Sequence, residues 1–317
     1  MSVNNRVQEI EKFAERISKV ISQIPGWNDG KATWSWISGG GAHKNFLVKN
    51  ADGVSRAVLK LWNRDWEGLG VIPPSAVPML NTLEAGHIGI GAPVIAIVDD
   101  PLAIMLEFLP GASIDLKDSD VLPRVAQKTR ELHDSGLCFR RDFNPFADAR
   151  IILTSAQRKG ATLPGDYNEI RRTLARIEKA LDFRSRDFVP SHNDLYSANI
   201  LEEPGGIIRF IDYDLSGNSD RCYDLGLMST FEGLNPDQID RLTQAYFGEC
   251  DPIMRARIEM LAIAADHHQF SLFAAALAAA DMNDDYNYTG FMRDIWSRIL
   301  ARVGSAEFGA YLSRIEA

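Results

Sequence analysis

The period of the hydrophobic residues changes once along this chain, and that change limits the folds that the chain can form. From about residue 33 to residue 109, apolar and polar residues mostly alternate, which is the pattern of strands with one buried face. Downstream of residue 109, apolar residues recur at helical spacing through nearly all of the chain. The pattern predicts an α+β protein, with a small antiparallel sheet followed by a larger, mainly helical part.

The expected elements follow from this period and from the turn residues. Strands are expected at residues 33–38, 44–49, 55–61, 93–98 and 102–108. Within residues 63–91 we expect one helix, preceded by a glycine- and proline-rich loop. Further helices are expected at residues 1–23, 121–135, 147–157, 167–181, 221–232, 236–248, 252–280 and 284–302, with a short β insert at 199–201 and 206–212. The chain is therefore expected to divide into lobes at residues 1–108 and 109–317.

Bulk composition excludes several classes of protein. With 317 residues, 45% hydrophobic and 24% charged, the chain has the composition of a soluble globular protein. A formal net charge of -9 argues against a nucleic-acid partner. No apolar run approaches the roughly 20 residues of a membrane span, and the first 23 residues do not resemble a signal peptide. The cysteines Cys138, Cys222 and Cys250 lack metal-binding spacing, which predicts reduced thiols in the cytoplasm.

One polar segment carries the side chains that kinase-type phosphoryl transfer needs. Asp194 is followed by Asn199 and, after a short apolar strand, by Asp212. We expect Asp194 to accept the proton of an attacking hydroxyl, and Asn199 and Asp212 to hold magnesium on nucleotide phosphates. We place His192 in the same catalytic loop, as a structural partner of the loop and not as the base. Aspartate and asparagine are also common turn formers, but the coincidence with a second acidic strand end favours a site.

The first lobe offers groups for the nucleotide. Lys60 lies on an expected strand between apolar residues, which favours a place in the cleft against phosphates over a surface position. The glycines Gly39, Gly40 and Gly41 allow a close approach of backbone to phosphates, although such a run is usually only a turn. At the hinge, Glu107 and Leu109 would offer backbone groups to the base of ATP, with GTP not excluded.

A lysine of this kind usually pairs with a glutamate on the helix of the first lobe. The candidates are Glu67 and Glu84, and neither is well placed. Glu67 lies in the glycine-rich segment before the helix, and Glu84 lies near the end of the helix. Asp214 follows Asp212 by two residues, and the residues leave open whether it supports the site or touches the substrate.

The motifs resemble those of a known family. His192, Asp194, Asn199 and the run Asp212-Tyr213-Asp214 are similar to two signature motifs of the choline/ethanolamine kinases, within the aminoglycoside-phosphotransferase-like branch of the kinase fold. The resemblance covers about residues 35–280, including residues 37–40, 58–60, 107–111, 132–135, 143–146, 216–218, 223–226 and 245–248. It implies that Asp194 is the base, that Asn199 and Asp212 hold Mg²⁺, that Lys60 binds phosphate and that Asp224 braces the catalytic loop. The chain departs from the family in having Asp214 where a glutamate is usual, and in lacking a clear helix glutamate.

The resemblance implies an alcohol substrate that is a cation. The quaternary ammonium of choline is best held by aromatic faces with a nearby carboxylate. The aromatic residues on expected cleft elements are Tyr196, Tyr213, Phe270, Phe273 and Tyr286. Family members tend to have tryptophan near Phe273, and both phenylalanines have helix packing as an alternative role. Asp281, Asp284 and Asp285 form an acidic patch that attracts an amino group or caps a helix.

We therefore predict a Mg²⁺- and ATP-dependent kinase that acts on choline, ethanolamine or a similar amino alcohol. Two alternatives stay open: a kinase for an aminoglycoside or another hydroxylated metabolite, and a kinase-shaped nucleotide-binding protein with little turnover. The first lobe would bind the nucleotide, and the second would carry the catalytic loop and the acceptor site. The sequence leaves the oligomeric state open.

Overall fold

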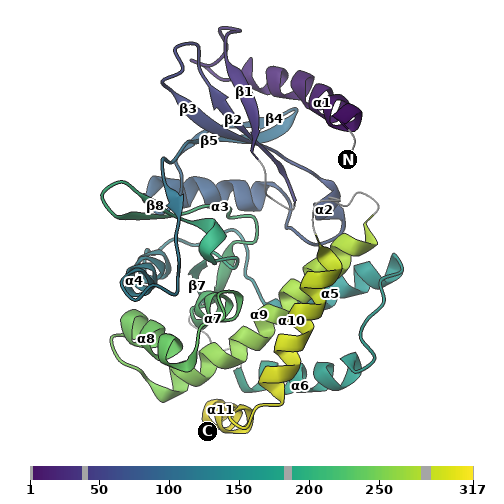
Figure 1. The fold of residues 1–317 in the computed structure, drawn as a ribbon, viewed down its shortest axis with the longest axis vertical. Coiled ribbons are helices and arrows are strands. Elements are labelled where there is room, and N and C mark those ends of the chain that lie inside the picture. Colours follow the sequence, from purple (N-terminus) through teal and green to yellow (C-terminus); the bar gives the residue numbers. More distant parts are fainter. Residues whose placement is uncertain (1–2, 38–41, 182–187, 280–286, 317) are drawn as a thin grey trace.

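The computed structural model describes residues 3–37, 42–181, 188–279 and 287–316 (Figure 1). Its elements form a sheet at the N-terminal end of the molecule and a helical assembly below it, as the ribbon in Figure 1 shows. The predicted α+β, kinase-like architecture is confirmed. The boundary between lobes at residue 108 stays a prediction.

The N-terminal sheet contains the five predicted strands. They are β1 (Thr33–Ile37), β2 (Lys44–Lys49), β3 (Arg56–Leu61), β4 (Val94–Asp99) and β5 (Leu102–Glu107). All neighbours are antiparallel, in the order β1-β2-β3-β5-β4. Successive side chains of β5 point to opposite faces of the sheet. Ala103 and Met105 belong to the hydrophobic cluster on one face, and Ile104 belongs to the hydrophobic cluster on the other face.

Helices cover the two faces of this sheet (Figure 1). Helix α1 (Val3–Ile21) packs Phe13, Ile17 and Val20 into the cluster that contains Phe46 and Leu59. The helix expected after a glycine- and proline-rich loop within residues 63–91 is α3 (Ala76–His87), and a short helix that was not predicted, α2 (Asp65–Gly68), precedes the loop. A loop with adjacent prolines, Pro73 and Pro74, separates them, since proline restricts the residue before it to extended conformations.

Helix α9 organises the C-terminal part. The helices are α4 (Val121–His133), α5 (Pro145–Arg158), α6 (Tyr167–Leu181), α7 (Cys222–Phe231), α8 (Pro236–Phe247), α9 (Pro252–Ala278), α10 (Tyr288–Val303) and α11 (Phe308–Glu316). α9 packs against α5, α7, α10 and α11. The closest approach is at Gly226 of α7, where an added Cβ would lie 2.7 Å from the backbone nitrogen of Ala262. Helix α11 was not predicted.

Two short sheets hold the segment with the polar motifs. β7 (Phe188–Ser191) pairs with β10 (Gly217–Asp220), and β8 (Ile200–Glu203) pairs with β9 (Ile207–Phe210) and with β6 (Ala112–Ser113). The predicted β insert corresponds to β8 and β9. The strand β10 was not predicted, because its sequence Gly-Asn-Ser-Asp has low strand propensity and is held by buried polar contacts. Within the described ranges, no helix is long and apolar enough to cross a bilayer.

Candidate active site

A left-handed turn after β7 carries Asp194. Asn193 has φ 64°, a conformation that asparagine tolerates better than most residues. Its backbone N–H donates to Asp224 Oδ1 at 2.7 Å, and its Nδ2 donates to the carbonyl of Leu215 at 3.1 Å. The turn is therefore fixed by buried hydrogen bonds on both sides, and the next residue, Asp194, is held in a set position.

Two side-chain amides hold the carboxylate of Asp194. Gln269 Nε2 of α9 donates to Oδ1 at 3.0 Å, and Asn199 Nδ2 donates to Oδ2 at 3.0 Å. Burial, with a contribution from the negative charge of Asp212, raises the pKa of Asp194 to about 7. A carboxylate with that pKa can accept a proton near neutral pH. Gln269 was not predicted, since it lies 75 residues from Asp194 and no local pattern marks it.

The hairpin of β8 and β9 brings Asn199, which precedes β8, and Asp212, which follows β9, to the same end of the hairpin. Asn199 ends a short 3-10 helix (Ser197–Asn199), Ile200 pairs with Phe210 across β8 and β9, and the N–H of Ile211 donates to the carbonyl of Asn199 at 2.9 Å. Asp212 then turns sharply, with φ 68°. A non-glycine residue with that φ is strained, and such strain often marks functional sites.

The donor chemistry at this end fits magnesium. Asn199 Nδ2 also donates to the backbone carbonyl of Asp194 at 2.8 Å, so both of its hydrogen bonds are made with Asp194. The Oδ1 atom of Asn199 is then a candidate metal ligand. With a carboxylate of Asp212 it gives the hard oxygen donors that Mg²⁺ prefers. In the described residues, no group of three or more His, Cys, Asp or Glu side chains is placed to hold a metal. Such a two-residue site suits an ion that keeps phosphate and water ligands.

Lys60 reaches these carboxylates from β3. Its Nζ lies 2.7 Å from Asp212 Oδ1, and 2.9 Å and 3.0 Å from the two carboxylate oxygens of Asp214. Burial opposes the charge on Lys60, but the two carboxylates outweigh burial and hold the pKa of Lys60 above its ordinary value. Burial also opposes ionisation of Asp212, but the Lys60 ammonium outweighs it and holds the pKa of Asp212 below its usual range. Lys60 and Asp212 are thus charged at neutral pH, whereas burial and the negative charge of Asp212 raise the pKa of Asp214.

Neither candidate glutamate pairs with Lys60. Glu67 Oε1 accepts a hydrogen bond from Trp62 Nε1 at 2.6 Å, and Glu84 forms an ion pair with Arg140. The acids that meet Lys60 come from the C-terminal part of the chain. The sequence singled out Asp212 and Asp214, but it did not show that they contact Lys60, because only tertiary structure brings them to β3.

His43 is a further member of this cluster that the sequence did not single out. It lies just after the glycine run and is buried, with 3% of its surface exposed. Its Nε2 lies 3.3 Å from Asp214 Oδ2, and its ring stacks on Trp62 with 3.8 Å between ring centroids. Burial, together with the positive charge of Lys60, lowers the pKa of His43 to about 3, so the ring is neutral.

His192 and Asp224 lie beneath the catalytic loop. His192 is fully buried, its Nε2 contacts the carbonyl of Ile211 at 2.8 Å, and burial lowers its pKa. Asp224 accepts the N–H of His192 at 2.9 Å and contacts His133 Nε2 at 3.1 Å. Burial opposes its charge, but the contact with His133 outweighs burial and lowers the pKa of Asp224. These positions fit a bracing role for both residues.

The predicted aromatic residues separate into two groups. Tyr213 and Phe270 are each 1% exposed, and their rings pack in the core, Tyr213 against His192 and Phe270 against Trp296. We therefore correct the prediction for these two and remove them from the substrate site, because a ring enclosed by core side chains presents no face to a substrate. Tyr196 is partly buried and packs against Phe231.

Phe273 lies on the same helix as Gln269, which holds Asp194. It is partly buried and lies one helical turn after Gln269 on α9, and residues four apart share a helix face. Its ring stacks on Phe291 at 5.5 Å between centroids and meets Tyr288 at 6.0 Å. The structure thus places an aromatic cluster one turn from a residue that touches Asp194.

The remaining predictions concern the nucleotide end. Glu107 ends β5 and Leu109 follows it, in the connection between the sheet and the C-terminal part. The glycines Gly39, Gly40 and Gly41 lie outside the described residues.

The residues predicted on the acceptor side after α9, Tyr286, Asp281, Asp284 and Asp285, also lie outside the described residues.

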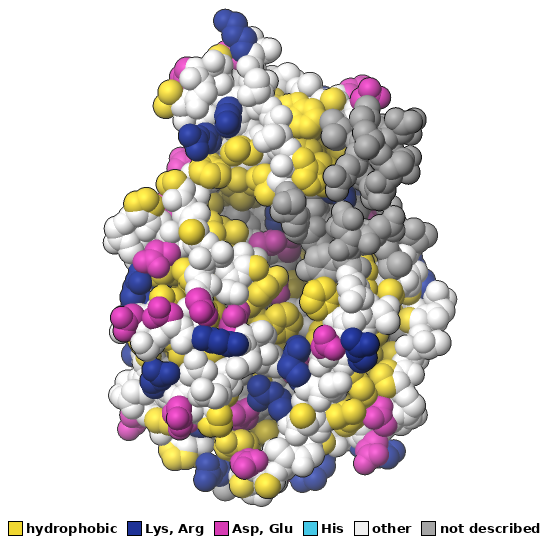
Figure 2. All heavy atoms as spheres, in the orientation of Figure 1, with side chains coloured by type: hydrophobic (Ala, Val, Ile, Leu, Met, Phe, Trp, Pro, Cys, Tyr) yellow, Lys and Arg dark blue, Asp and Glu magenta, His cyan; other side chains and the backbone are white. Residues whose placement is uncertain are grey.

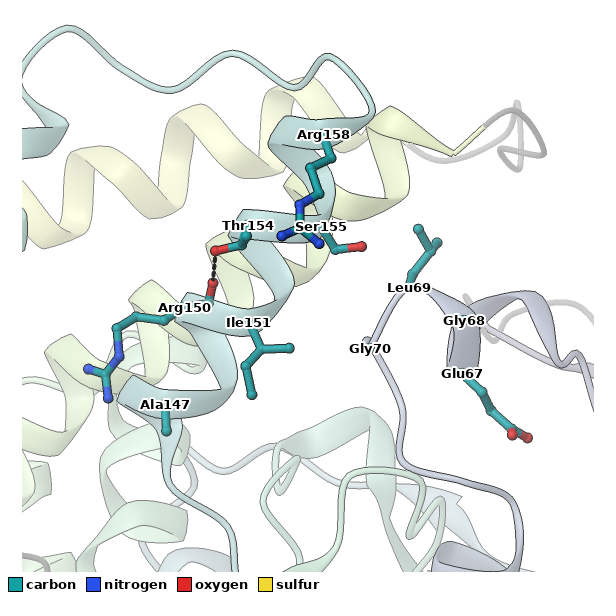
Figure 3. Close-up of a pocket in the computed structure, with 10 residues that line it drawn as sticks. All are labelled: Glu67, Gly68, Leu69, Gly70, Ala147, Arg150, Ile151, Thr154, Ser155 and Arg158. Atoms are coloured by element: carbon teal, nitrogen blue, oxygen red, sulfur yellow. Dashed lines mark hydrogen bonds between the residues drawn. The ribbon is translucent and has the colours of Figure 1, made fainter.

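Figure 2 shows a hollow on one face of the molecule. On the face drawn in Figure 2, the surface is hollowed between the N-terminal sheet and the helices below it, and acidic side chains lie in the hollow. A separate open pocket of about 630 Å³ lies between the segment Glu67–Gly70 and helix α5 (Figure 3). Its lining includes Leu69, Ile151 and Arg158 but none of the residues predicted from the motifs.

The chain is similar to several known proteins. Among curated proteins, the protein LicA of Haemophilus influenzae is 23% identical over 151 residues, which are 47% of this chain and 44% of LicA. The chain thus spans about half the length of the curated relatives it matches, between 44% and 55%.

Solved structures extend the likeness over nearly the whole chain. A choline/ethanolamine kinase family protein from Mesorhizobium loti has a TM-score of 0.77 and 21% identity, covering 96% of this chain and 99% of that one. The choline kinase LicA from Streptococcus pneumoniae has a TM-score of 0.76 and 18% identity, covering 93% and 99%. These likenesses confirm the predicted kinase-like fold and the resemblance. Residues 33–261 match the phosphotransferase enzyme family, and the chain belongs to that family.

Proposed function

We propose that the protein is a Mg²⁺- and ATP-dependent kinase that transfers the γ-phosphoryl group to the hydroxyl of choline, ethanolamine or a similar amino alcohol. The observation that carries this proposal is the pairing of Asp194 with Asn199, beside the Lys60 and Asp212 ion pair. A proton acceptor, a candidate metal site and a phosphate-binding cation are thereby linked through short contacts. That combination is what phosphoryl transfer needs.

The residues have separate tasks in this proposal. Asp194 orients the acceptor hydroxyl and takes its proton as the new bond from oxygen to phosphorus forms and the bond to the leaving ADP breaks. Gln269 and Asn199 keep the carboxylate of Asp194 in one orientation. Lys60 neutralises phosphate charge, and Asn199 and Asp212 would hold magnesium. Magnesium bound there supplies further neutralisation of the phosphate oxygens.

An aromatic cluster supports a cationic acceptor. Phe273 contacts both Tyr288 and Phe291, and Phe273 shares a face of α9 with Gln269. Aromatic faces attract a quaternary ammonium, and the attraction is worth about 0.5–2 kcal/mol for each cation placed over a ring. Asp194 itself adds negative charge at the reacting end. An amino alcohol, with a cation two carbons from its hydroxyl, matches this arrangement.

The test is to identify the phosphorylated product. The full chain is incubated with Mg-ATP and, separately, choline, ethanolamine, an aminoglycoside and no acceptor, and the products are read by phosphorus NMR and mass spectrometry. The proposal expects a phosphate monoester of choline or ethanolamine. A product only with the aminoglycoside would refute the proposed acceptor, and ATP consumption equal to the blank with every acceptor would refute the proposed activity.

A further inference from the structure

Lys60 and Asp214 link the N-terminal sheet to the C-terminal part of the chain. The ammonium contacts both oxygens of Asp214, at 2.9 Å and 3.0 Å, across 154 positions of sequence. It also contacts Asp212 at 2.7 Å. Asp212 is a proposed metal ligand, so its pairing with Lys60 competes with a cation. Asp214 is the acid that can stay paired with Lys60 without that competition.

Asp214 has a second partner from the N-terminal part. His43 Nε2 lies 3.3 Å from Asp214 Oδ2, and His43 Nδ1 accepts the backbone N–H of Asn63 at 3.0 Å. Because Nδ1 is the acceptor, the hydrogen of the neutral ring is on Nε2, which faces Asp214. The stack on Trp62 holds the ring plane. His43 Nε2 is buried and makes no hydrogen bond with a described residue, so its hydrogen faces Asp214 Oδ2 at 3.3 Å and is not used elsewhere.

The N-terminal helices use their polar groups elsewhere. Glu67 and Glu84 bind Trp62 and Arg140. In the middle of α3, the buried Asn81 donates to Ser216 Oγ at 3.0 Å and accepts the N–H of Arg140 at 3.0 Å. Helix α3 is thus tied to the segment after Asp214, and it contributes no acid to Lys60 among the residues described.

We propose that Asp214 and His43 together position Lys60 for the nucleotide phosphates, the task that an acid on the N-terminal helix would otherwise perform. Asp214 fixes where the ammonium lies, and the Nε2–H of His43 fixes how the carboxylate is turned. This inference rests on the proposed function, because it assigns two residues to the nucleotide end of the same site.

A matched pair of histidine variants separates this role from packing. In His43→Gln, the amide nitrogen takes the place of Nε2 and keeps a donor toward Asp214. In His43→Asn, the amide oxygen takes the place of Nδ1 and keeps only the acceptor for Asn63. Both lose the ring stack on Trp62, so a role in packing alone would affect them alike. Asp214→Asn and Asp214→Glu form the corresponding pair for the carboxylate.

The readout is the affinity for a fluorescent ADP analogue in EDTA, which needs neither metal nor acceptor. We expect Asp214→Asn and His43→Asn to weaken binding by about tenfold, because each variant removes a polar group that faces the ion pairs of Lys60. The Asp214→Glu and His43→Gln variants should bind clearly tighter than their partners. The double variant Asp214→Asn/His43→Asn should bind no more weakly than Asp214→Asn alone, since coupled residues are not additive.

In steady-state kinetics, we expect only the KM for the nucleotide to change. The KM for ATP should rise in Asp214→Asn and His43→Asn, while the KM for the acceptor stays the same. Equal losses in His43→Gln and His43→Asn, or unchanged ADP affinity in both asparagine variants, would overturn the inference. Wild-type protein that binds no ADP analogue would instead refute the proposed function, so the two failures are distinguishable.

Discussion

Gln269 Nε2 lies 3.0 Å from Asp194 Oδ1 and joins the middle of the longest helix to the catalytic loop. The two residues are 75 positions apart, and the contact is almost buried, with 5% of Gln269 exposed. The proposed base is therefore held by a scaffold helix as well as by its own loop. This arrangement makes Gln269 a positioning residue whose removal should affect the rate more than binding.

Replacement of Gln269 tests that role. Gln269→Leu removes one of the two donors to Asp194, so we expect kcat to fall about tenfold or more, the effect of a lost hydrogen bond to a charged group. The KM for ATP should change little, because Gln269 contacts no nucleotide-binding residue. Steady-state kinetics measure both, and Gln157→Leu on the exposed side of α5 is the matched control. A rise in the KM for ATP with kcat unchanged would contradict the assignment.

Phe273 should control the affinity for a cationic acceptor. Phe273→Ala removes the ring one helical turn from Gln269, and we expect the KM for choline to rise about fivefold or more, while Phe273→Trp should lower it because tryptophan binds cations best. The KM for ATP serves as the internal control. If both variants leave the KM for choline at the wild-type value, the acceptor lies elsewhere.

Gly226 tests the packing that supports the catalytic loop. Its added Cβ would lie 2.7 Å from the nitrogen of Ala262 and 2.9 Å from the carbonyl oxygen of Ile258. We expect Gly226→Ala to lower the free energy of unfolding by about 1–3 kcal/mol, because backbone atoms cannot give way cheaply. In Gly309→Ala on α11, nothing lies within 4 Å of the new Cβ, so stability should hold or rise slightly. Urea unfolding measures both, and equal effects would refute the close contact.

Buried His268 should make stability fall in acid. Burial, with Arg141 and His267 nearby, lowers its pKa in the folded chain to about 3, whereas the unfolded chain has the ordinary value near 6.5. Above pH 6.5 neither state binds this proton, and below it only the unfolded state does, so stability is lost as pH falls. The slope is about 1.4 kcal/mol per pH unit for this one group.

The measurement is the free energy of unfolding at pH 7, 6 and 5, compared between wild type and His268→Phe. Other groups titrate in both proteins, and the difference between the two proteins isolates His268. Wild type should lose more stability than the variant with each step toward acid. Parallel curves would mean that His268 is protonated in the folded chain or exposed.

The sequence predicted those parts of the structure that depend on local pattern. Alternating residues placed the five strands, and helical periodicity placed α4 to α10 with ends shifted by a few residues. The strand β10 was missed, because buried polar contacts hold Asn218 where strand propensity is low. The glycine- and proline-rich loop before α3 was predicted, whereas the four-residue helix α2 was not.

Within the site, the sequence identified the residues joined by short-range motifs. Asp194, Asn199, Asp212 and Lys60 lie together as expected, although their catalytic roles stay proposals. Gln269 and His43 were missed, because each meets its partner only through tertiary packing. Tyr213 and Phe270 were overinterpreted, since aromatic residues on a helix or strand near a site are as often core residues, and here both are buried.

The most direct test of the account is ADP release from Mg-ATP with choline or ethanolamine, measured for wild type and Asp194→Asn side by side. The account predicts acceptor-dependent release by wild type and a loss of about a hundredfold or more in kcat for the variant. The variant should still bind the fluorescent ADP analogue, because Asp194 is assigned to the acceptor end. Acceptor-dependent release that survives undiminished in Asp194→Asn would contradict the central claim that this carboxylate is the base.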